Sequence, residues 1–160
     1  MQSQAVDQPM VLSPASRPGA ANRLRGALIF APCATILALS VWLIPHKSGH
    51  GTHRELGLPP CAFLAETGYP CPSCGMTTAF ANMAHGHFVA AFRAQPFGVA
   101  MFAVVAVLAA VGLGELLTGR DFVRLLRLGP WWAVAAIVGI FGGWGIKIAW
   151  GLASGTLPVR

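Results

Sequence analysis

The sequence predicts an all-α membrane protein with three transmembrane helices and a Cys-knuckle loop between the first two. Three apolar runs, at about residues 26–45, 97–117 and 131–151, are long enough at ~1.5 Å per residue to cross the ~30 Å core of a bilayer. Charged residues make up only 10% of the chain, against about 25% in soluble domains. A soluble chain of this composition would struggle to cover its surface with polar groups, whereas a lipid-facing chain need not.

Residues 1–25 are polar and contain several prolines, which predicts a disordered cytoplasmic tail. They make a poor signal peptide, because the apolar run that follows is too long and no small-residue cleavage site comes after it. We therefore expect an uncleaved first helix and a membrane domain over residues 26–160. Pro32 falls within the first turns of this helix, where proline is tolerated best, and Pro45 ends it.

The distribution of Lys and Arg predicts the orientation. Arginines gather in the tail and in the loop at 118–130: Arg17, Arg23, Arg25, Arg120, Arg124 and Arg127. The longer loop at 46–96 has the fewest Lys and Arg per residue, so the positive-inside rule places it and the C-terminus outside, with the N-terminus in the cytoplasm. No basic stripe with interleaved aromatics appears, so the net charge of +6 does not indicate nucleic acid.

The second half of the outer loop, residues 76–94, is apolar with helical spacing. Gly86 interrupts the pattern as a left-handed helix stop, and Pro96 closes it. We expect two short amphipathic helices that lie in the membrane interface or are tucked between the spanning helices. The two histidines beside Gly86 and the charge of Arg93 argue against a fourth span.

Several residues within the spans are chemically distinctive. Gly139 and Gly143 form a small-xxx-small pair, which we expect to pack against the first or second helix rather than against another copy. Glu115 and Lys147 lie near opposite membrane faces, so we expect each to extend to its own interface and the two not to pair. Cys33, in the first helix, is most simply a small apolar core residue.

Three cysteines, Cys61, Cys71 and Cys74, mark the outer loop as the candidate site. A first interpretation is structural, with a disulfide or thiol knuckle whose connectivity the sequence does not determine. The protein would then be a non-enzymatic accessory or assembly module. The absence of any complete catalytic set favours this interpretation.

A second interpretation is a zinc site. Cys71 and Cys74 have the spacing of a zinc knuckle, and an H-x-x-H pair, His50 and His53, lies upstream. Seventeen residues separate His53 from Cys71, a separation similar to that in many zinc sites. Cys61 is able to replace one of the histidines as a ligand.

A third interpretation is a membrane thiol–disulfide oxidoreductase that uses Cys71 and Cys74. A cysteine at a helix N-terminus favours its thiolate, and Pro72 makes the motif similar to the Cys-Pro-x-Cys of such enzymes. No βαβ pattern is present, so a thioredoxin fold is excluded. A helical membrane enzyme of this kind needs a second thiol pair, and Cys61 is the one cysteine nearby.

The cysteine segment reads Thr67-Gly68-Tyr69-Pro70-Cys71-Pro72-Ser73-Cys74-Gly75-Met76-Thr77, with Cys61 before it and His85-Gly86-His87 and Gln95-Pro96 after it. This pattern resembles domain-of-unknown-function family 2752. The resemblance covers roughly residues 58–117. It implies a small, multi-pass protein of a bacterial inner membrane, with the knuckle at its centre, and it implies no biochemical activity.

This sequence departs from the family pattern at three positions. Thr78 stands where the family has Arg, His87 where it has an acid, and Gln95 where it has Asn. The Arg and the acid of the family pattern are therefore both absent from this sequence, so any interaction between them is absent as well. The expected partners are the lipid bilayer and, as an open alternative, another membrane protein, and no soluble small-molecule substrate is indicated.

Overall fold

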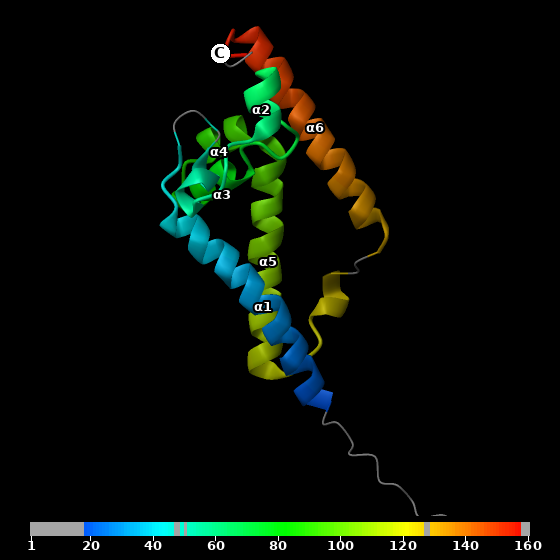
Figure 1. Cartoon of the computed structure of the whole chain (residues 1–160). Helices are drawn as coiled ribbons and strands as arrows, with labels where there is room; N and C mark the ends of the chain where they lie inside the picture. Colours follow the sequence, from blue (N-terminus) through cyan, green and yellow to red (C-terminus); the bar gives the residue numbers. More distant parts are fainter. Residues whose placement is uncertain (1–17, 47–48, 50, 127–128, 158–160) are drawn as a thin grey trace, which may run out of the picture.

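The computed structural model describes residues 18–46, 49, 51–126 and 129–157, and within these ranges it contains helices and no strand. Three helices are long and apolar enough to cross a membrane: α1 (Pro18–Trp42), α5 (Pro96–Thr118) and α6 (Trp131–Ala153). The shorter elements are a 3₁₀ turn at Thr52–Leu56, α2 (Ala62–Thr67), α3 (Met76–Ala84), α4 (Phe88–Ala94) and a 3₁₀ turn at Val123–Leu126. The predicted fold class, an all-α membrane protein with three spans, is confirmed (Figure 1).

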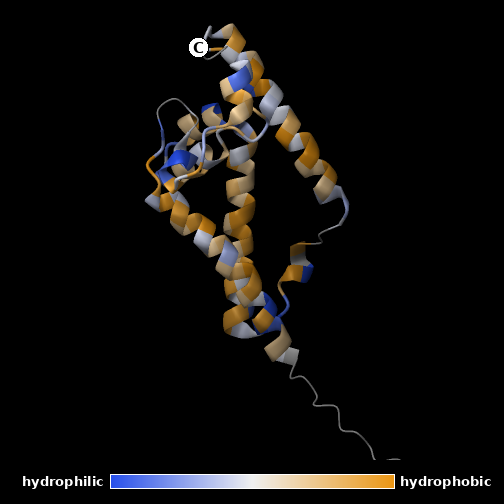
Figure 2. Ribbon diagram, in the orientation of Figure 1, coloured by the Kyte–Doolittle hydropathy of each residue, from blue (hydrophilic) through white to orange (hydrophobic). Residues whose placement is uncertain are grey.

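Helices α1 and α5 cross in close contact and form the core of the membrane part (Figure 1). Two glycines allow the approach. A Cβ at Gly26 would lie 2.7 Å from the carbonyl oxygen of Gly112, and a Cβ at Gly112 would lie 2.8 Å from the backbone nitrogen of Phe30. Small residues at such crossings let two backbones touch, which strengthens packing where lipid offers no hydrophobic driving force. Figure 2 shows that apolar residues cover the long helices.

Helix α1 begins at Pro18, and not at residue 26 as the apolar pattern predicts. The tail expected over residues 1–25 therefore does not reach residue 25, and residues 1–17 lie outside the described part. Residues 18–25 are helical because their polar side chains have partners in the fold: Asn22 Nδ2, for example, donates a hydrogen bond of 2.9 Å to the Gly119 carbonyl. Pro32 consequently lies in the middle of the helix and not in its first turns.

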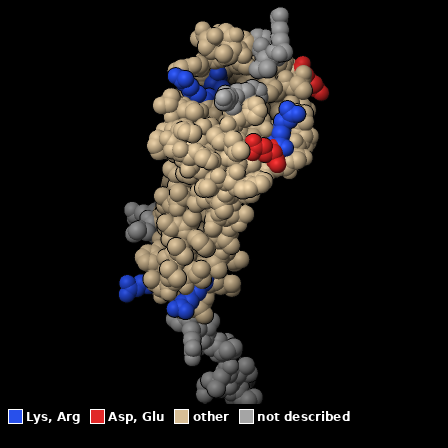
Figure 3. All heavy atoms as spheres, turned by 90° about the vertical axis from the view of Figure 1, so that its left-hand side faces the viewer, with Lys and Arg blue, Asp and Glu red and all other residues tan. Residues whose placement is uncertain are grey.

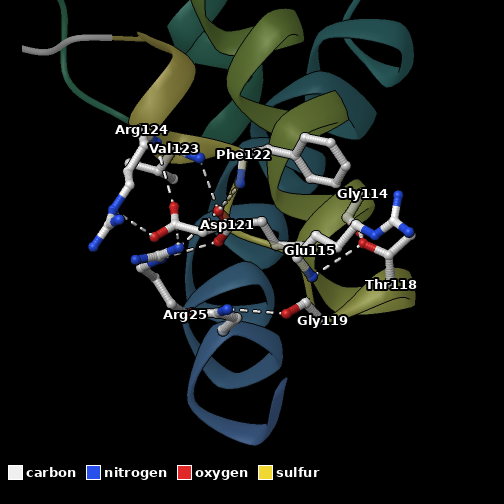
Figure 4. Close-up of polar contacts among 11 residues, drawn as sticks. Arg25, Gly114, Glu115, Thr118, Gly119, Asp121, Phe122, Val123 and Arg124 are labelled. Atoms are coloured by element: carbon white, nitrogen blue, oxygen red, sulfur yellow. Dashed lines mark hydrogen bonds and ion pairs between the residues drawn. The ribbon is translucent and has the colours of Figure 1, made fainter. Parts of the chain in front are cut away.

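Glu115 on α5 is fully buried, so the prediction that it extends to the membrane interface is wrong. Its carboxylate accepts hydrogen bonds from Arg25 Nε at 2.9 Å and Arg25 Nη2 at 2.8 Å. The backbone N–H groups of Phe122 and Val123 each donate a further bond of 2.8 Å (Figure 4). Arg25 also forms an ion pair of 2.8 Å with Asp121, so this cluster joins α1, α5 and the following loop.

Helix α6 packs against the start of α5 through the predicted glycine pair. A Cβ at Gly139 would overlap the ring of Phe97, and a Cβ at Gly143 would lie 3.0 Å from both the Cβ and the backbone nitrogen of Phe97. The pair was expected to pack internally against the first or second span, and the structure shows that it packs against the second. Most of α6 is exposed, as suits a helix surrounded by lipid.

Gly139→Ala is expected to lower the stability of the protein by about 1–3 kcal/mol, because the added methyl group forces the Phe97 ring out of place. The matched control is Gly142→Ala on the same helix, where a Cβ meets nothing within 4 Å. That change is expected to be neutral or slightly stabilising, because alanine has the higher helix propensity. Unfolding in a detergent titration measures both, and equal effects at the two positions would contradict the proposed packing.

The two short helices predicted in the outer loop are present as α3 and α4. Gly86 has a φ of +76° and lies just beyond the end of α3, so the predicted left-handed stop is confirmed. Helix α3 contacts α1, α4 and α5, and is therefore tucked between the spanning helices. Helix α4 exposes large apolar side chains, among them Phe88 and Val89, which suits a helix at a membrane surface.

The chain has two polar ends separated by an apolar middle. The start of α1, the end of α5 and the Arg25 cluster lie at one end, and the cysteine loop lies at the other beside the C-terminal half of α6 (Figure 1). On the face shown in Figure 3, charged side chains gather at the two ends and leave the middle uncharged. This distribution agrees with three spans across a bilayer.

Candidate functional site

The backbone between α2 and α3 turns sharply enough to bring three cysteines together. Cys61 is the residue just before α2, and Gly68 ends that helix with a φ of +73°. The chain then reverses, and the Cys74 N–H donates a hydrogen bond of 3.0 Å to the Cys71 carbonyl, which closes a tight turn. Gly75, with a φ of +90°, leads from this turn into α3. Positive φ is costly for other residues, which explains a glycine directly after the C-x-x-C.

The ligand atoms of Cys61, Cys71 and Cys74 all lie within 4.8 Å of one another. Cys74 is buried, the other two are partly exposed, and all three are free thiols. A tetrahedral zinc ion with ~2.3 Å metal–sulfur bonds places its sulfurs about 3.8 Å apart. The three thiols are therefore close to metal-binding geometry, and small side-chain movements suffice to reach it.

The two cysteines of the C-x-x-C differ in acidity. Burial raises the pKa of Cys71, but hydrogen bonds from Ser73, Cys74 and Cys61 outweigh burial and lower its pKa to about 7. The Ser73 hydroxyl lies 3.3 Å from the Cys71 sulfur. Burial, together with the hydrogen bond to Cys71, raises the pKa of Cys74 to about 12. Cys71 is thus the thiol of this pair that ionises near neutral pH.

In metal-free, reduced protein, alkylation of Cys71 by iodoacetamide is expected to follow a titration with a midpoint near pH 7. The rate rises with pH because the thiolate is the reactive form, and an ordinary cysteine would have its midpoint near pH ~8.5. Cys74 should stay nearly unreactive to pH 9 or so, because its pKa is raised to about 12. Mass spectrometry of each cysteine measures both rates, and a Cys71 midpoint at or above that of an ordinary cysteine would contradict the geometry. Ser73→Ala is expected to raise the Cys71 midpoint.

A cavity of about 250 Å³ opens beside the cysteines. Cys61 and Cys74 line it, together with His46, His53 and Arg54. His53 Nε2 lies 3.2 Å from the Pro59 carbonyl oxygen. A carbonyl only accepts hydrogen bonds, so this contact requires the proton on Nε2, and Nδ1 is then the ring nitrogen with a lone pair for a metal.

The structure places the predicted ligands unequally. It brings Cys61, Cys71 and Cys74 together, and it places His53 on the wall of the same cavity. Among the described residues, His53 does not belong to the group of donor atoms within 4.8 Å of one another. His50 lies outside the described residues.

Three side chains from distant elements hold the cysteine loop by alternate backbone carbonyls. Trp144 Nε1 donates to the Pro70 carbonyl at 2.7 Å, and Gln95 Nε2 donates to the Pro72 carbonyl at 2.8 Å. Lys147 Nζ donates to the Cys74 carbonyl at 2.9 Å. Lys147 therefore binds the loop, a partner that was not predicted from the sequence. We call these three donors the carbonyl clamp.

The carbonyl clamp was not predicted from the sequence. Trp144 and Lys147 are three residues apart, which places them on one face of α6, and this spacing was the available signal. Nothing in the sequence showed that this face meets the cysteine loop.

The cysteine turn, α3 and α4 lie within the segment that carries the motif-based resemblance. Residues 61–109 match the family model DUF2752, a protein of unknown function. The predicted resemblance is thereby confirmed. The DUF2752 match begins at Cys61 and includes both cysteines of the C-x-x-C. No curated protein and no solved structure matches the chain.

Two of the departures from the DUF2752 pattern have structural roles here. Thr78 is fully buried, and its hydroxyl lies 2.8 Å from the hydroxyl of Thr52, so this position joins α3 to the 3₁₀ turn before α2. Gln95 is part of the carbonyl clamp. His87 is exposed just before α4.

Proposed function

We propose that this chain is a non-enzymatic membrane protein that binds a zinc ion through Cys61, Cys71 and Cys74. The supporting observation is the convergence of three sulfur ligands within 4.8 Å in a turn clamped from outside. Thiolates are the ligands that structural zinc sites use most, and a pKa of about 7 makes Cys71 ready to lose its proton. The site would act as an assembly or accessory feature of the membrane protein.

His53 is the proposed fourth ligand, through Nδ1. Histidines that bind metals usually donate their other N–H to a carbonyl or carboxylate, and the contact of His53 Nε2 with Pro59 fits this pattern. His53 also lines the cavity that Cys61 and Cys74 border. Because its ring lies outside the group of close donor atoms, metal binding requires the ring to move across this cavity.

The proposed location is a bacterial inner membrane, with the cysteine site on the outer side. Arg23, Arg25, Arg120 and Arg124 lie at the end of the molecule opposite the cysteines, which the positive-inside rule assigns to the cytoplasm. The bacterial origin follows from the kind of proteins that the motif resembles.

A titration of reduced, detergent-solubilised protein with cobalt(II), a spectroscopic substitute for zinc, tests the proposal. We expect saturation at one equivalent, with sulfur-to-cobalt charge-transfer bands and the visible bands of a tetrahedral site. His53→Ala should weaken binding and shift the visible bands, whereas His85→Ala, at the far end of α3, should change neither. Absence of thiolate–cobalt bands in the wild type would contradict the proposed metal site. An unchanged His53→Ala spectrum would exclude His53 as a ligand and leave the three cysteine ligands in place.

A second candidate function, thiol–disulfide exchange, is favoured by the difference between Cys71 and Cys74. A partly exposed thiolate beside a buried thiol suits attack and resolution. The Cys71 thiolate would attack a substrate disulfide and release one substrate thiolate. Cys74 would then attack Cys71, release the second substrate thiol and leave a Cys71–Cys74 disulfide. Substrate would gain the two electrons that the pair loses.

Thiol trapping in intact cells separates the two functions. A zinc site predicts cysteines that resist alkylation until a chelator is added, and no change on adding reductant. An exchange enzyme predicts a substantial fraction of chains with a Cys71–Cys74 disulfide, which mild reductant opens and chelator does not affect.

A further inference from the structure

Lys147 is the one charged residue of α6, and it lies beside the cysteine turn. A charged side chain within a membrane-spanning segment is costly and normally has a specific partner. The Lys147 ammonium donates to the carbonyl of Cys74, which belongs to one of the proposed metal ligands. The charge of α6 is therefore directed into the site and away from lipid.

Gly75 makes room for this charge. A Cβ at residue 75 would lie 2.7 Å from Lys147 Nζ and 2.5 Å from the Ala94 carbonyl oxygen. Any side chain at this position would therefore displace the ammonium group or the end of α4. The glycine after the C-x-x-C consequently serves both the positive φ of the turn and the approach of Lys147.

The charge of the proposed centre matches that of Lys147. Three thiolates and a neutral imidazole around a divalent ion leave one net negative charge. An uncompensated charge is costly where burial lowers the local dielectric, as it does at the buried Cys74. We propose that Lys147 is a positioning residue that supplies the counter-charge for the metal–thiolate centre and fixes the cysteine turn. This inference rests on the proposed metal-binding function.

The test compares the zinc dissociation constants of variants in the full-length, reduced protein, by competition with a chromophoric chelator. Lys147→Met removes the charge and keeps an apolar side chain of similar length, and we expect zinc affinity to fall about 10- to 100-fold, as for other residues that support metal ligands. Lys147→Arg keeps the charge and should restore most of the affinity. Arg124→Gln, at the opposite end of the molecule, is the matched control and should change nothing.

Copper(I) distinguishes a charge effect from a change in loop position. Three thiolates around a monovalent ion leave two negative charges, so Lys147→Met should weaken copper(I) binding by a larger factor than zinc binding. Trp144→Phe removes the clamp bond to Pro70 without a change in charge, and it should affect the two metals equally.

The outcomes separate the inference from the function it rests on. A wild type that binds neither metal contradicts the proposed function, and the inference falls with it. Equal zinc dissociation constants for the wild type and Lys147→Met overturn the inference and leave the proposed function intact. Equal losses for both metals in Lys147→Met, with no recovery in Lys147→Arg, overturn the counter-charge role.

Discussion

Serine in place of Cys74 is expected to abolish tight zinc binding, with a loss of at least ~100-fold in affinity. Cys74 is the buried member of the three-sulfur cluster, and a serine hydroxyl stays protonated at neutral pH and binds zinc poorly. Structural zinc sites with all their ligands contribute about 10–16 kcal/mol of binding free energy, so the loss of one ligand has a large effect. Competition with a chromophoric chelator measures the change.

Cys71→Ser supplies an independent test, because Cys71 is partly exposed and its replacement disturbs packing less than that of buried Cys74. Cys33→Ala is the matched control. It also removes one thiol, but Cys33 lies in the apolar core with Phe80 and Val105. We expect the control to keep its zinc. Normal zinc affinity in well-folded Cys71→Ser and Cys74→Ser proteins would show that these sulfurs are not ligands.

Arg25→Met is expected to destabilise the protein by about 3 kcal/mol. The change leaves the fully buried Glu115 carboxylate without its cationic partner, and breaking a buried ion pair on one side costs about 3–5 kcal/mol. The lower end of this range applies because the Arg25 side chain is 39% exposed and two backbone N–H groups still bind the carboxylate. A detergent unfolding titration measures the loss.

The control for this change is Arg124→Met. Arg124 pairs with Asp121 at 3.1 Å, but its side chain is 88% exposed, and exposed ion pairs contribute about 0–1 kcal/mol. The double variant Arg25→Met with Glu115→Leu should recover part of the stability, because no buried charge remains unpaired. If Arg25→Met is as stable as Arg124→Met, the cluster does not hold the two helices together.

The spans were predictable from the sequence because length and apolar content determine them. The predicted second span, 97–117, differs from α5 by one residue at each end. The start of α1 was not predictable in the same way. Polar residues 18–25 are helical through partners such as Glu115, which is 90 positions from Arg25. A hydropathy pattern contains no information on such long-range pairs.

The cysteine site was predictable as a set of residue types and only partly as a geometry. The C-x-x-C spacing indicated a knuckle, and Cys61 was a candidate because it lies in the same loop. The carbonyl clamp was not predictable from the sequence pattern, because Trp144 and Lys147 are more than 70 positions from the carbonyls they bind. The role of His53 as a ligand stays a prediction.

The most direct test of the metal site is the zinc content of the protein, purified without chelators and normalised to chain concentration. A membrane protein with a site at Cys61, Cys71 and Cys74 should contain close to one equivalent of zinc, and Cys74→Ser should contain almost none. Less than about a tenth of an equivalent in the wild type, with no uptake when zinc is added to the reduced protein, would contradict the metal site.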